Sequence, residues 1–278
     1  MARPFLKWAG GKAKLAPVII ERAPAHFARY HEPFLGAGAV FFAMAAHRPT
    51  PATLTDANTA LIETFTAVRD DVEGLIAALR PMAEEYLAAS PERRADIYYD
   101  VRANPPLGGV ARAAWLIFLN KTCFNGLYRE NQSGGFNVPH GRYKQPGILD
   151  AGLLRACSAA LAATELKASD FDAACANATA GDFVYLDPPY HPLSATSSFT
   201  SYTSGDFGFP EQERLRDAYE GLTRRGVAAI LSNSDHPAIR DLYAGRGYRI
   251  ETVSMSRMIN SVGAKRQPVG ELLVSNFG

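Results

Sequence analysis

The tetrapeptide Asp187-Pro188-Pro189-Tyr190 has the residue types needed to hold a planar amine. The two prolines lack N–H donors and have restricted backbones, so their carbonyl oxygens remain available as acceptors. Asp187 and the Pro188 carbonyl could each accept an N–H of an exocyclic amino group, while the Tyr190 ring stacks on the base. Holding both protons would turn the nitrogen lone pair toward an electrophile. The tetrapeptide follows the apolar run 183–186, which is typical of a buried parallel strand, and open α/β sheets bind ligands at the carboxyl ends of their strands.

A glycine-rich turn at 34–38 (Phe-Leu-Gly-Ala-Gly) follows a short predicted strand at 30–32. Glycines there would let a ligand approach the backbone, and the following helix would present free N–H groups. Asp56, at the end of the next predicted strand, could accept hydrogen bonds from ribose hydroxyls. Because Phe41 replaces the third glycine of the dinucleotide fingerprint, the turn favours a nucleoside ligand over a nicotinamide dinucleotide. A structural turn capped by Asp56 is the alternative interpretation.

The segment 6–12 (Leu-Lys-Trp-Ala-Gly-Gly-Lys) combines an aromatic residue, two glycines and a lysine. It is not a phosphate-binding P-loop, because Ala13 stands where that motif requires Ser or Thr. Trp8 and Lys12 could line a pocket for a ligand that carries a carboxylate or a sulfonium. Trp8 could also be a core anchor.

Residues 123–147 are aromatic, basic and rich in glycine, and Ser133-Gly-Gly135 predicts a hairpin or a long loop. Arg129 could donate to both O6 and N7 of a guanine. Apolar residues could wedge between bases or stack on them, and cations could contact phosphates. The apolar candidates are Phe124, Leu127 and Tyr128, and the cations are Lys121, Arg142 and Lys144. An ordinary surface hairpin remains the alternative.

Alternating strands and helices must position these motifs. Strands are predicted at 30–32, 52–55, 164–167, 183–186, 227–231, 248–255 and 271–277. Helices are predicted at 39–47, 58–80, 83–89, 92–103, 110–121, 150–163, 169–176, 210–225 and 237–244, with prolines 81, 91, 105 and 106 between them. Repeated strand–helix units indicate a doubly wound α/β domain, and the helical stretch 58–122 with the hairpin predicts an inserted lobe.

Composition sets the class of protein. Of the 278 residues, 47% are hydrophobic and 21% are charged, which is typical of a soluble globular protein. No apolar run reaches the ~18–20 residues of a membrane span, and the N-terminus lacks the apolar region of a secretory signal. The cysteines Cys123, Cys157 and Cys175 have no C-x-x-C spacing. We therefore expect neither a disulfide framework nor a metal site, and a reducing cytoplasm as the location.

Charge is distributed unevenly, although the formal net charge is only +1. Residues 1–22, 112–144 and 246–266 each carry a net charge of +4, and residues 56–100 carry −6. A basic face could therefore attract phosphates. Scattered solvated charge is the alternative.

Several motifs resemble, in the same order, those of the Dam-like DNA adenine-N6 methyltransferases, which are class alpha amino-methyltransferases. They lie at 5–12, 32–38, 56–58, 125–127, 135–139, 141–143, 187–190, 193–196 and 232–233. The resemblance spans nearly the whole chain. The ordered set is more specific than D-P-P-Y alone, which has relatives in other amino-methylating enzymes.

The resemblance implies a Rossmann-like methyltransferase sheet with a small, mainly helical target-recognition lobe that carries a β-hairpin. We expect a catalytic domain of residues 1–57 and 145–278 and a DNA-binding lobe of residues 58–144. The catalytic residues would be Asp187, Pro188, Pro189 and Tyr190. The cofactor would be S-adenosylmethionine, held by Trp8, Lys12, Glu32, Phe34, Gly36, Gly38, Asp56, Asp170, Phe171 and Asp187, with Asp170 and Phe171 around its adenine.

The resemblance also places DNA contacts at Lys7, Phe124, Asn125, Leu127, Arg129, Asn137, Pro139, Arg142 and Lys144. Phe124 stands near the intercalating position, where the family often has Tyr, and Arg129 stands at a guanine-reading position. The implied activity is methylation of N6 of an adenine flipped out of double-stranded DNA, in a GATC-like site. We expect a bacterial or phage protein that is a monomer, with no membrane or metal partner. A cognate restriction nuclease as a further partner and independent action in replication or repair marking are alternatives that stay open.

Other functions remain open at this point. An RNA-adenine methyltransferase or an N4-cytosine methyltransferase could use the same amine pocket. A DNA-binding module with an inactive pocket would keep the lobe without the chemistry. The segment 123–144 favours DNA over RNA, and the intact donor and target motifs favour an enzyme.

Overall fold

The computed structural model describes residues 1–190, 207–255 and 269–278, and seven strands of these residues form one sheet. The strands are β1 (Tyr30–Glu32), β2 (Ala52–Asp56), β3 (Thr164–Ala168), β4 (Phe183–Leu186), β5 (Ala228–Ser234), β6 (Arg249–Met255) and β7 (Val269–Ser275). Their order is β3-β2-β1-β4-β5-β7-β6. The pairs from β3 to β5 are parallel, and β7 runs antiparallel to both of its neighbours, β5 and β6. This is the predicted doubly wound, Rossmann-like sheet. Its strand order reverses between β1 and β4, where such sheets bind ligands.

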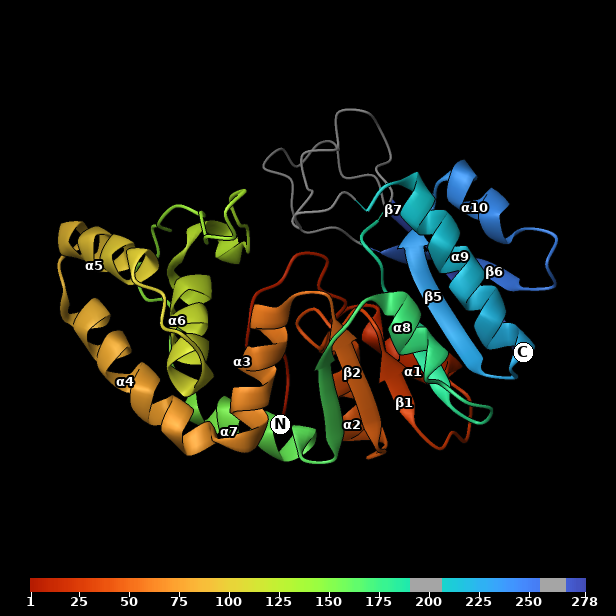
Figure 1. Ribbon diagram of the computed structural model, residues 1–278, viewed down its shortest axis with the longest axis horizontal. Coiled ribbons are helices and arrows are strands. Elements are labelled where there is room, and N and C mark those ends of the chain that lie inside the picture. The colour runs from red at the N-terminus through yellow and green to blue at the C-terminus, as the bar shows by residue number, and fades with distance from the viewer. Residues whose placement is uncertain (191–206, 256–268) are drawn as a thin grey trace.

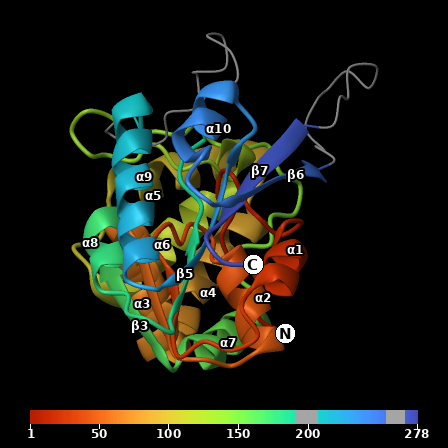
Figure 2. The same ribbon diagram turned by 90° about the vertical axis from the view of Figure 1, so that its right-hand side faces the viewer.

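Helices cover both faces of the sheet. They are α1 (Ala16–Arg22), α2 (Ala39–His47), α3 (Thr59–Asp70), α4 (Val72–Ala88), α5 (Pro91–Ala103), α6 (Gly109–Thr122), α7 (Ala151–Leu161), α8 (Phe171–Ala176), α9 (Phe209–Arg224) and α10 (Pro237–Tyr243). Figure 2 shows α8 and α9 on one face of the sheet and α1 and α2 on the other. No helix of the described ranges is both long enough and apolar enough to cross a membrane.

Strand β4 shows why the sheet needs two cores. Phe183 and Tyr185 pack into the cluster that contains α1 and α2, whereas Val184 and Leu186 pack into the cluster that contains α9 and α10. Successive side chains of a strand point to opposite faces, so a strand covered on both faces has to be apolar throughout. All four side chains are buried, and the apolar run 183–186 was the sequence signal for this strand.

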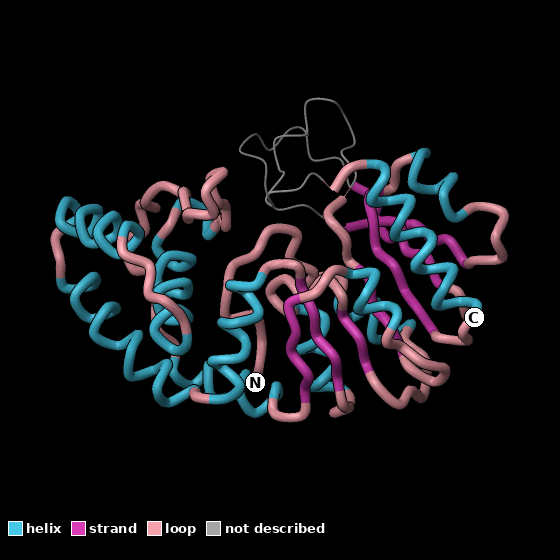
Figure 3. The backbone as a smooth tube through the Cα atoms, in the orientation of Figure 1, coloured by secondary structure: helices cyan, strands magenta, loops and turns pink. Residues whose placement is uncertain are grey.

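Helices α4, α5 and α6 form a lobe beside the sheet, on the left of Figure 1. Figure 3 shows that the regular structure of this lobe is helical and that the strands lie in the other part of the molecule. Helix α3 joins the two parts, because it packs against β2 and β3 as well as against α4 and α6.

The predicted break at Pro81 is wrong. Helix α4 continues through this proline, and the chain breaks earlier, at Asp71, whose side chain accepts a hydrogen bond from the Gly74 N–H and caps α4. An Asp at the N-cap satisfies a helix-end donor, whereas the missing N–H of exposed Pro81 costs one intrahelical bond. Helix α1 was not predicted; it has seven residues and no side-chain cap.

The segment 123–147 contains a short 3-10 turn, η1 (Phe124–Gly126), followed by irregular backbone. Its antiparallel pairing consists of two isolated bridges, Cys123 with His140 and Glu130 with Phe136. The hairpin-like course is present, but it lacks a regular ladder. We call residues 123–147 the reading segment, after the DNA-reading role that the sequence resemblance leads us to expect for them. Figure 1 shows it at the top of the lobe, level with the upper end of β5.

Candidate active site and DNA-reading segment

The residues predicted for catalysis and donor binding gather at the carboxyl edge of the parallel strands. Glu32 ends β1, Asp56 ends β2, Asp170 follows β3, and Asp187 follows β4. The N-terminal segment brings Lys12 to the same edge, where its ammonium meets the Asp187 carboxylate. Residues that are far apart in sequence thus share one edge because parallel strands all end there.

Asp187 is the centre of a polar cluster. Its Oδ1 lies 3.1 Å from the Lys12 Nζ and accepts a hydrogen bond of 3.0 Å from the Ser232 hydroxyl. Ser232 in turn lies 2.8 Å from the Tyr185 hydroxyl. The Lys12 Nζ also lies 4.2 Å from the centroid of the Tyr190 ring, which is a cation–π distance.

Burial governs the electrostatics of this cluster. It raises the pKa of the Asp187 carboxyl, while the Lys12 ammonium and the Ser232 hydroxyl oppose that rise. The side chains of Lys12 and Asp187 are 8% and 17% exposed, so solvent screens the pair weakly. Lys12 therefore favours the ionised form of Asp187, which is the form that accepts hydrogen bonds from an amine.

Gly36 and Gly38 make the turn that precedes α2, and both have positive φ, 49° and 70°. A Cβ added to Gly36 would lie 3.2 Å from the Trp8 ring, which therefore covers this part of the turn. The Asp56 carboxylate accepts hydrogen bonds from the backbone N–H groups of Gly36 (3.0 Å) and Asn58 (2.9 Å). Asp56 fixes the turn, so the structural interpretation of this acid is correct; a second role toward a ligand stays a prediction.

Glu32 is buried, and its Oε2 accepts a hydrogen bond of 2.7 Å from the Tyr30 hydroxyl. Burial raises the pKa of Glu32 to about 8, and the negative charge of Asp187 adds to that rise. The pKa of Asp56 is raised by burial as well. Three carboxyl groups with raised pKa values at one edge form an environment that a cationic ligand would stabilise, because a nearby positive charge favours the ionised carboxylates.

Phe34 stacks on Phe171 with ring centroids 5.4 Å apart, and Phe207 packs edge-on against Phe34 and at a tilt against Phe171, with centroids 5.8 Å away in both cases. Asp170 caps α8 and pairs with Arg214 at 2.7 Å. The Arg214 guanidinium also lies over the Phe171 ring. Aromatic rings beside a carboxylate suit a purine with an amino group. Phe207 and Arg214 were not expected from the sequence.

The buried amides Gln212 and Asn233 are further site residues that were not predicted. Gln212 donates a hydrogen bond of 3.0 Å to the Pro189 carbonyl and accepts one of 2.9 Å from Asn233. Gln212 lies on the helical face of α9 that is otherwise apolar, so a buried glutamine at a core position was the signal available in the sequence.

The N-terminal segment is attached to the lobe by Asn120, which is buried in α6. The Asn120 side chain accepts from the Lys7 N–H at 2.8 Å and donates to the Lys7 carbonyl at 2.7 Å and to the Gly126 carbonyl at 3.1 Å. One residue further, the Trp8 ring stacks on Tyr128 of the reading segment, with centroids 5.1 Å apart. Trp8 thus lies between the reading segment and the Gly36 turn.

Several predicted DNA-contacting side chains are exposed. Phe124 is 51% exposed, and Asn125 next to it has a φ of 55°, in the left-handed region. Arg129 donates to the Asn137 side chain at 2.6 Å, so these two predicted contacts form one unit. The exposed group also contains Lys7, Pro139, Arg142 and Lys144, whereas Leu127 is partly buried. The Lys7 Nζ lies over the Tyr143 ring, on the lobe side of the N-terminal segment.

The third basic stretch, 246–266, differs from the other two because its described arginines are paired with acidic side chains. Arg246 pairs with Glu220, and Arg249 pairs with Glu251. These two arginines are thus neutralised by acids of the sheet domain. Arg257, Lys265 and Arg266 lie outside the described residues, as does the motif at 193–196.

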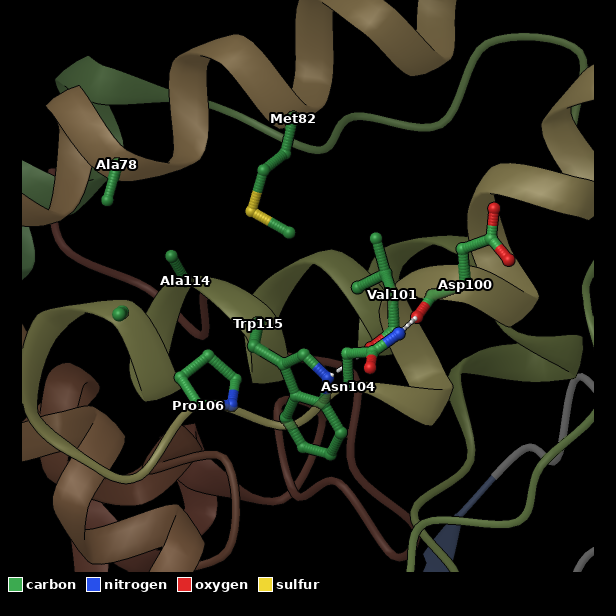
Figure 4. A pocket seen from close by; sticks show the side chains of 9 residues that line it. Ala78, Met82, Asp100, Val101, Asn104, Pro106, Ala114 and Trp115 are labelled. Atoms are coloured by element: carbon green, nitrogen blue, oxygen red, sulfur yellow. Dashed lines mark hydrogen bonds between the residues drawn. The ribbon is translucent and has the colours of Figure 1, made fainter.

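A separate cavity of about 380 Å³ lies in the lobe, between α4, the end of α5, and α6. Met82, Val101 and Trp115 line it, and Figure 4 shows these side chains around the hollow. It shares no residue with the predicted site, and we assign no ligand to it. Across the three described ranges, no group of three or more His, Cys, Asp or Glu side chains could hold a metal ion.

Comparison with known proteins decides the class of enzyme. A family model described as D12 class N6 adenine-specific DNA methyltransferase matches residues 8–259. The chain belongs to this family. It is an adenine-specific DNA methyltransferase, and its substrate is DNA. Membership removes the N4-cytosine, RNA-adenine and nicotinamide interpretations, and it removes the DNA-binding module without activity.

Individual relatives cover nearly the full length of this methyltransferase. It is 41% identical to the type II methyltransferase M.MjaIII of Methanocaldococcus jannaschii, over 99% of both chains. It is 38% identical to the type II methyltransferase M1.LlaDCHI of Lactococcus lactis subsp. cremoris, over 99% of this chain and 96% of that protein. It is 36% identical to the DNA adenine methylase of Escherichia coli K12, over 98% and 94%.

Proposed function

We propose that this methyltransferase moves a methyl group from S-adenosylmethionine to N6 of an adenine flipped out of duplex DNA, in a short GATC-like site. The observation that carries the proposal is the cluster of Lys12, Asp187, Ser232 and Tyr190 directly after β4. An acceptor carboxylate, a diproline backbone and an aromatic ring stand together at the strand end. This set suits an extruded adenine, whose amino group and ring face need those partners.

The donor would lie along the same edge. Trp8, Gly36 and Gly38 would approach its chain, and Glu32, Asp56 and Asp187 would face its cationic centres and ribose. Phe34, Asp170 and Phe171 would hold its adenine. S-adenosylmethionine, when bound, supplies a methyl group made electrophilic by a sulfonium. The raised pKa values of Glu32 and Asp56 support this placement, since burial without a cation leaves the charged carboxylates unfavourable.

In the proposed reaction the protein contributes position and electrostatics. Asp187 and the Pro188 carbonyl accept the two amino protons and fix the nitrogen, and Tyr190 stacks on the base. As N6 forms its bond to the methyl carbon, the carbon–sulfur bond would break and its electron pair would leave with sulfur, which becomes a neutral thioether. The nitrogen would become positively charged, and the Asp187 carboxylate would take up its proton. Correct orientation of the two reactants supplies most of the rate enhancement.

The cysteines have no part in this proposal. Burial raises the pKa of Cys123 and of Cys157 to about 11 and that of Cys175 to about 12. All three thiols are therefore protonated near neutral pH, and a covalent intermediate on sulfur is unnecessary.

The lobe of residues 58–144 would read the site, with the catalytic domain formed by 1–57 and 145–278. Arg129 would donate to a guanine, Phe124 would enter the base stack, and Lys7, Arg142 and Lys144 would contact phosphates. Asn125, Leu127, Asn137 and Pro139 would complete the contact surface. We propose a monomer that acts on DNA in the cytoplasm, with a restriction nuclease specific for the same site as its functional partner.

One experiment tests the donor, the base and the site together. Plasmid DNA that contains a random insert is incubated with the protein and S-adenosylmethionine, and N6-methyladenine is mapped by single-molecule sequencing. We expect methylation confined to the adenine of one short site related to GATC. Methylation scattered over unrelated sequences, or a modified base other than adenine, would contradict the proposal.

A further inference from the structure

Gln212 lies in the interior of the molecule, far in sequence from the corner at Asp187–Tyr190. It belongs to α9, and its side chain is fully buried. Its Nε2 donates to the Pro189 carbonyl at 3.0 Å, and its Oε1 accepts from the Asn233 Nδ2 at 2.9 Å. A buried amide is costly unless both ends are paired, and here both ends are paired.

The neighbouring strand fixes which way the Gln212 amide points. The Asn233 Oδ1 accepts a hydrogen bond of 2.8 Å from the Ser234 backbone N–H, so the Nδ2 of Asn233 faces Gln212. Gln212 must then present its oxygen to Asn233 and its nitrogen to Pro189. The orientation of this amide is dictated by the network, and only that orientation gives Pro189 a donor.

The bond to Pro189 acts directly on the catalytic geometry. The Pro189 carbonyl belongs to the peptide plane that precedes Tyr190, so anchoring this oxygen fixes the backbone from which the Tyr190 ring projects. Because the Pro189 carbonyl already accepts this hydrogen bond, the Pro188 carbonyl is the one left to accept an amino proton together with Asp187.

Strand β5 reaches the corner from both faces of the sheet. Ser232 donates to Asp187, and its neighbour Asn233 acts through Gln212 on Pro189. Successive residues of a strand point to opposite faces. The two ends of the corner are therefore held by adjacent side chains of one strand.

We propose that Gln212 is a positioning residue for methyl transfer: its amide, oriented by Asn233, holds the Pro189–Tyr190 peptide in the geometry that receives the target amino group. The proposal rests on the function proposed above. The Gln212 amide is fully engaged with Pro189 and Asn233, so we expect its removal to affect the rate of the chemical step and to leave the binding of donor and DNA intact.

Two substitutions separate this role from packing. Gln212→Leu removes both hydrogen bonds. Gln212→Glu keeps the size of the side chain and the oxygen that accepts from Asn233. An ionised carboxylate, however, has no proton to donate and would place an acceptor oxygen next to the Pro189 carbonyl oxygen. A protonated carboxyl can donate to Pro189 again, and burial raises the pKa of such a group. Glu213→Gln, an exposed neighbour on α9, is the control.

The experiment measures single-turnover methylation of duplex DNA from pH 6 to pH 9, with the Kd values of DNA and of S-adenosylhomocysteine. For Gln212→Leu we expect a rate at least about tenfold below wild type at every pH, with both Kd values within about threefold of wild type. For Gln212→Glu we expect the rate relative to wild type to be near one at pH 6 and to fall by about tenfold by pH 9. The control should follow wild type throughout.

Wild-type rates in both Gln212 variants, or a loss that appears only in the Kd values, would overturn the proposal. If Gln212→Leu does not fold, Gln212→Glu and Asn233→Asp still decide, because Asn233→Asp should reverse the Gln212 amide and slow the same step. A flat ratio to wild type across pH in Gln212→Glu, with an unchanged rate in Asn233→Asp, would be the negative result. Failure of the proposed function is distinguishable, since wild type itself would then form no N6-methyladenine.

Discussion

Lys12 is the residue whose charge most affects the corner. It is buried, it pairs with Asp187 at 3.1 Å, and its ammonium lies over the Tyr190 ring. Removing one member of a buried ion pair leaves the other charge uncompensated, which costs ~3–5 kcal/mol in measured cases. The proposed reaction needs an ionised carboxylate at Asp187, and this pair favours that form.

We predict that Lys12→Met slows methylation by at least about tenfold at pH 7 and that part of the loss is recovered at higher pH. Without the ammonium, the pKa of Asp187 rises further above its ordinary value, so less of the carboxyl is ionised at neutral pH. The measurement is kcat from pH 6 to pH 9, with Lys167→Met on exposed β3 as the control. A pH profile with the wild-type shape would count against this role for Lys12.

Glu32 should make the fold less stable as the pH rises. In the unfolded chain this carboxyl ionises near pH 4.5, whereas in the folded protein burial raises its pKa to about 8. The folded state therefore binds more protons between these values, and stability is lost as the pH rises through this window, by at most ~1.4 kcal/mol per pH unit.

For Glu32→Gln we predict a free energy of unfolding that improves relative to wild type as the pH rises from 5 to 8. The glutamine oxygen can still accept from Tyr30, and no ionisation has to be suppressed. Urea denaturation at pH 5, 6.5 and 8 measures the difference. A difference that does not change with pH would show that Glu32 is not held protonated by the fold.

Among the elements, the N-terminal segment contacts both the reading segment and the corner at Asp187. Asn120 holds Lys7, Tyr128 stacks on Trp8, and Lys12 reaches Asp187, all within six residues of one segment. The reading segment and the corner at Asp187 are therefore both in contact with one short stretch of backbone, residues 7–12, which turns at Gly10.

We predict that Gly126→Ala weakens DNA binding through this segment. Gly126 has a φ of 64°, and an added Cβ would lie 2.6 Å from the Lys7 Cβ, so both strain and a clash would displace η1 or Lys7. Gly134→Ala is a matched control, because Gly134 has a φ of 76° but open space around it. DNA affinity by fluorescence anisotropy should fall for Gly126→Ala by about tenfold more than for Gly134→Ala. Equal effects would leave backbone strain alone as the cause.

At this scale the sequence predicted well what depends on local pattern. The apolar run 183–186 and the turn at 34–38 predicted the strand and the loop that carry candidate site residues. A strand buried on both faces is apolar throughout, and backbone with positive φ favours glycine, so both features can be recognised in the sequence. The helix break predicted at Pro81 was wrong, because the helix begins after the capping residue Asp71, ten residues earlier, and continues through the proline. Gln212 and Asn120 could not be assigned roles, because their partners lie 23 and 113 residues away.

For the whole molecule, the proposed function requires the sheet edge and the reading segment to act on the same stretch of DNA. Two basic stretches, 1–22 and 112–144, contribute exposed cations, whereas Arg246 and Arg249 of the third are paired with acids. The near-neutral total charge is thus compatible with a basic surface around the reading segment, and site preference should depend on that segment.

Arg129→Ala should relax the preference for one guanine by ~1–3 kcal/mol, which is the value of a bidentate contact to O6 and N7. Lys144→Ala, by contrast, should weaken binding to all sequences alike and lower the salt dependence by about one phosphate contact. Methylation rates on a set of duplexes that differ at one base pair measure the first effect, and DNA affinity at several salt concentrations measures the second. If Arg129→Ala ranks the duplexes by methylation rate in the same order as wild type, Arg129 does not make the guanine contact.

The most direct test of the central claim is the rate of N6-methyladenine formation by Asp187→Ala, under single-turnover conditions with DNA and donor both saturating. If the corner after β4 holds the target amino group, the rate should fall by at least about a thousandfold, while circular dichroism and DNA affinity match wild type. A rate within about tenfold of wild type would place the chemistry away from Asp187 and contradict the account.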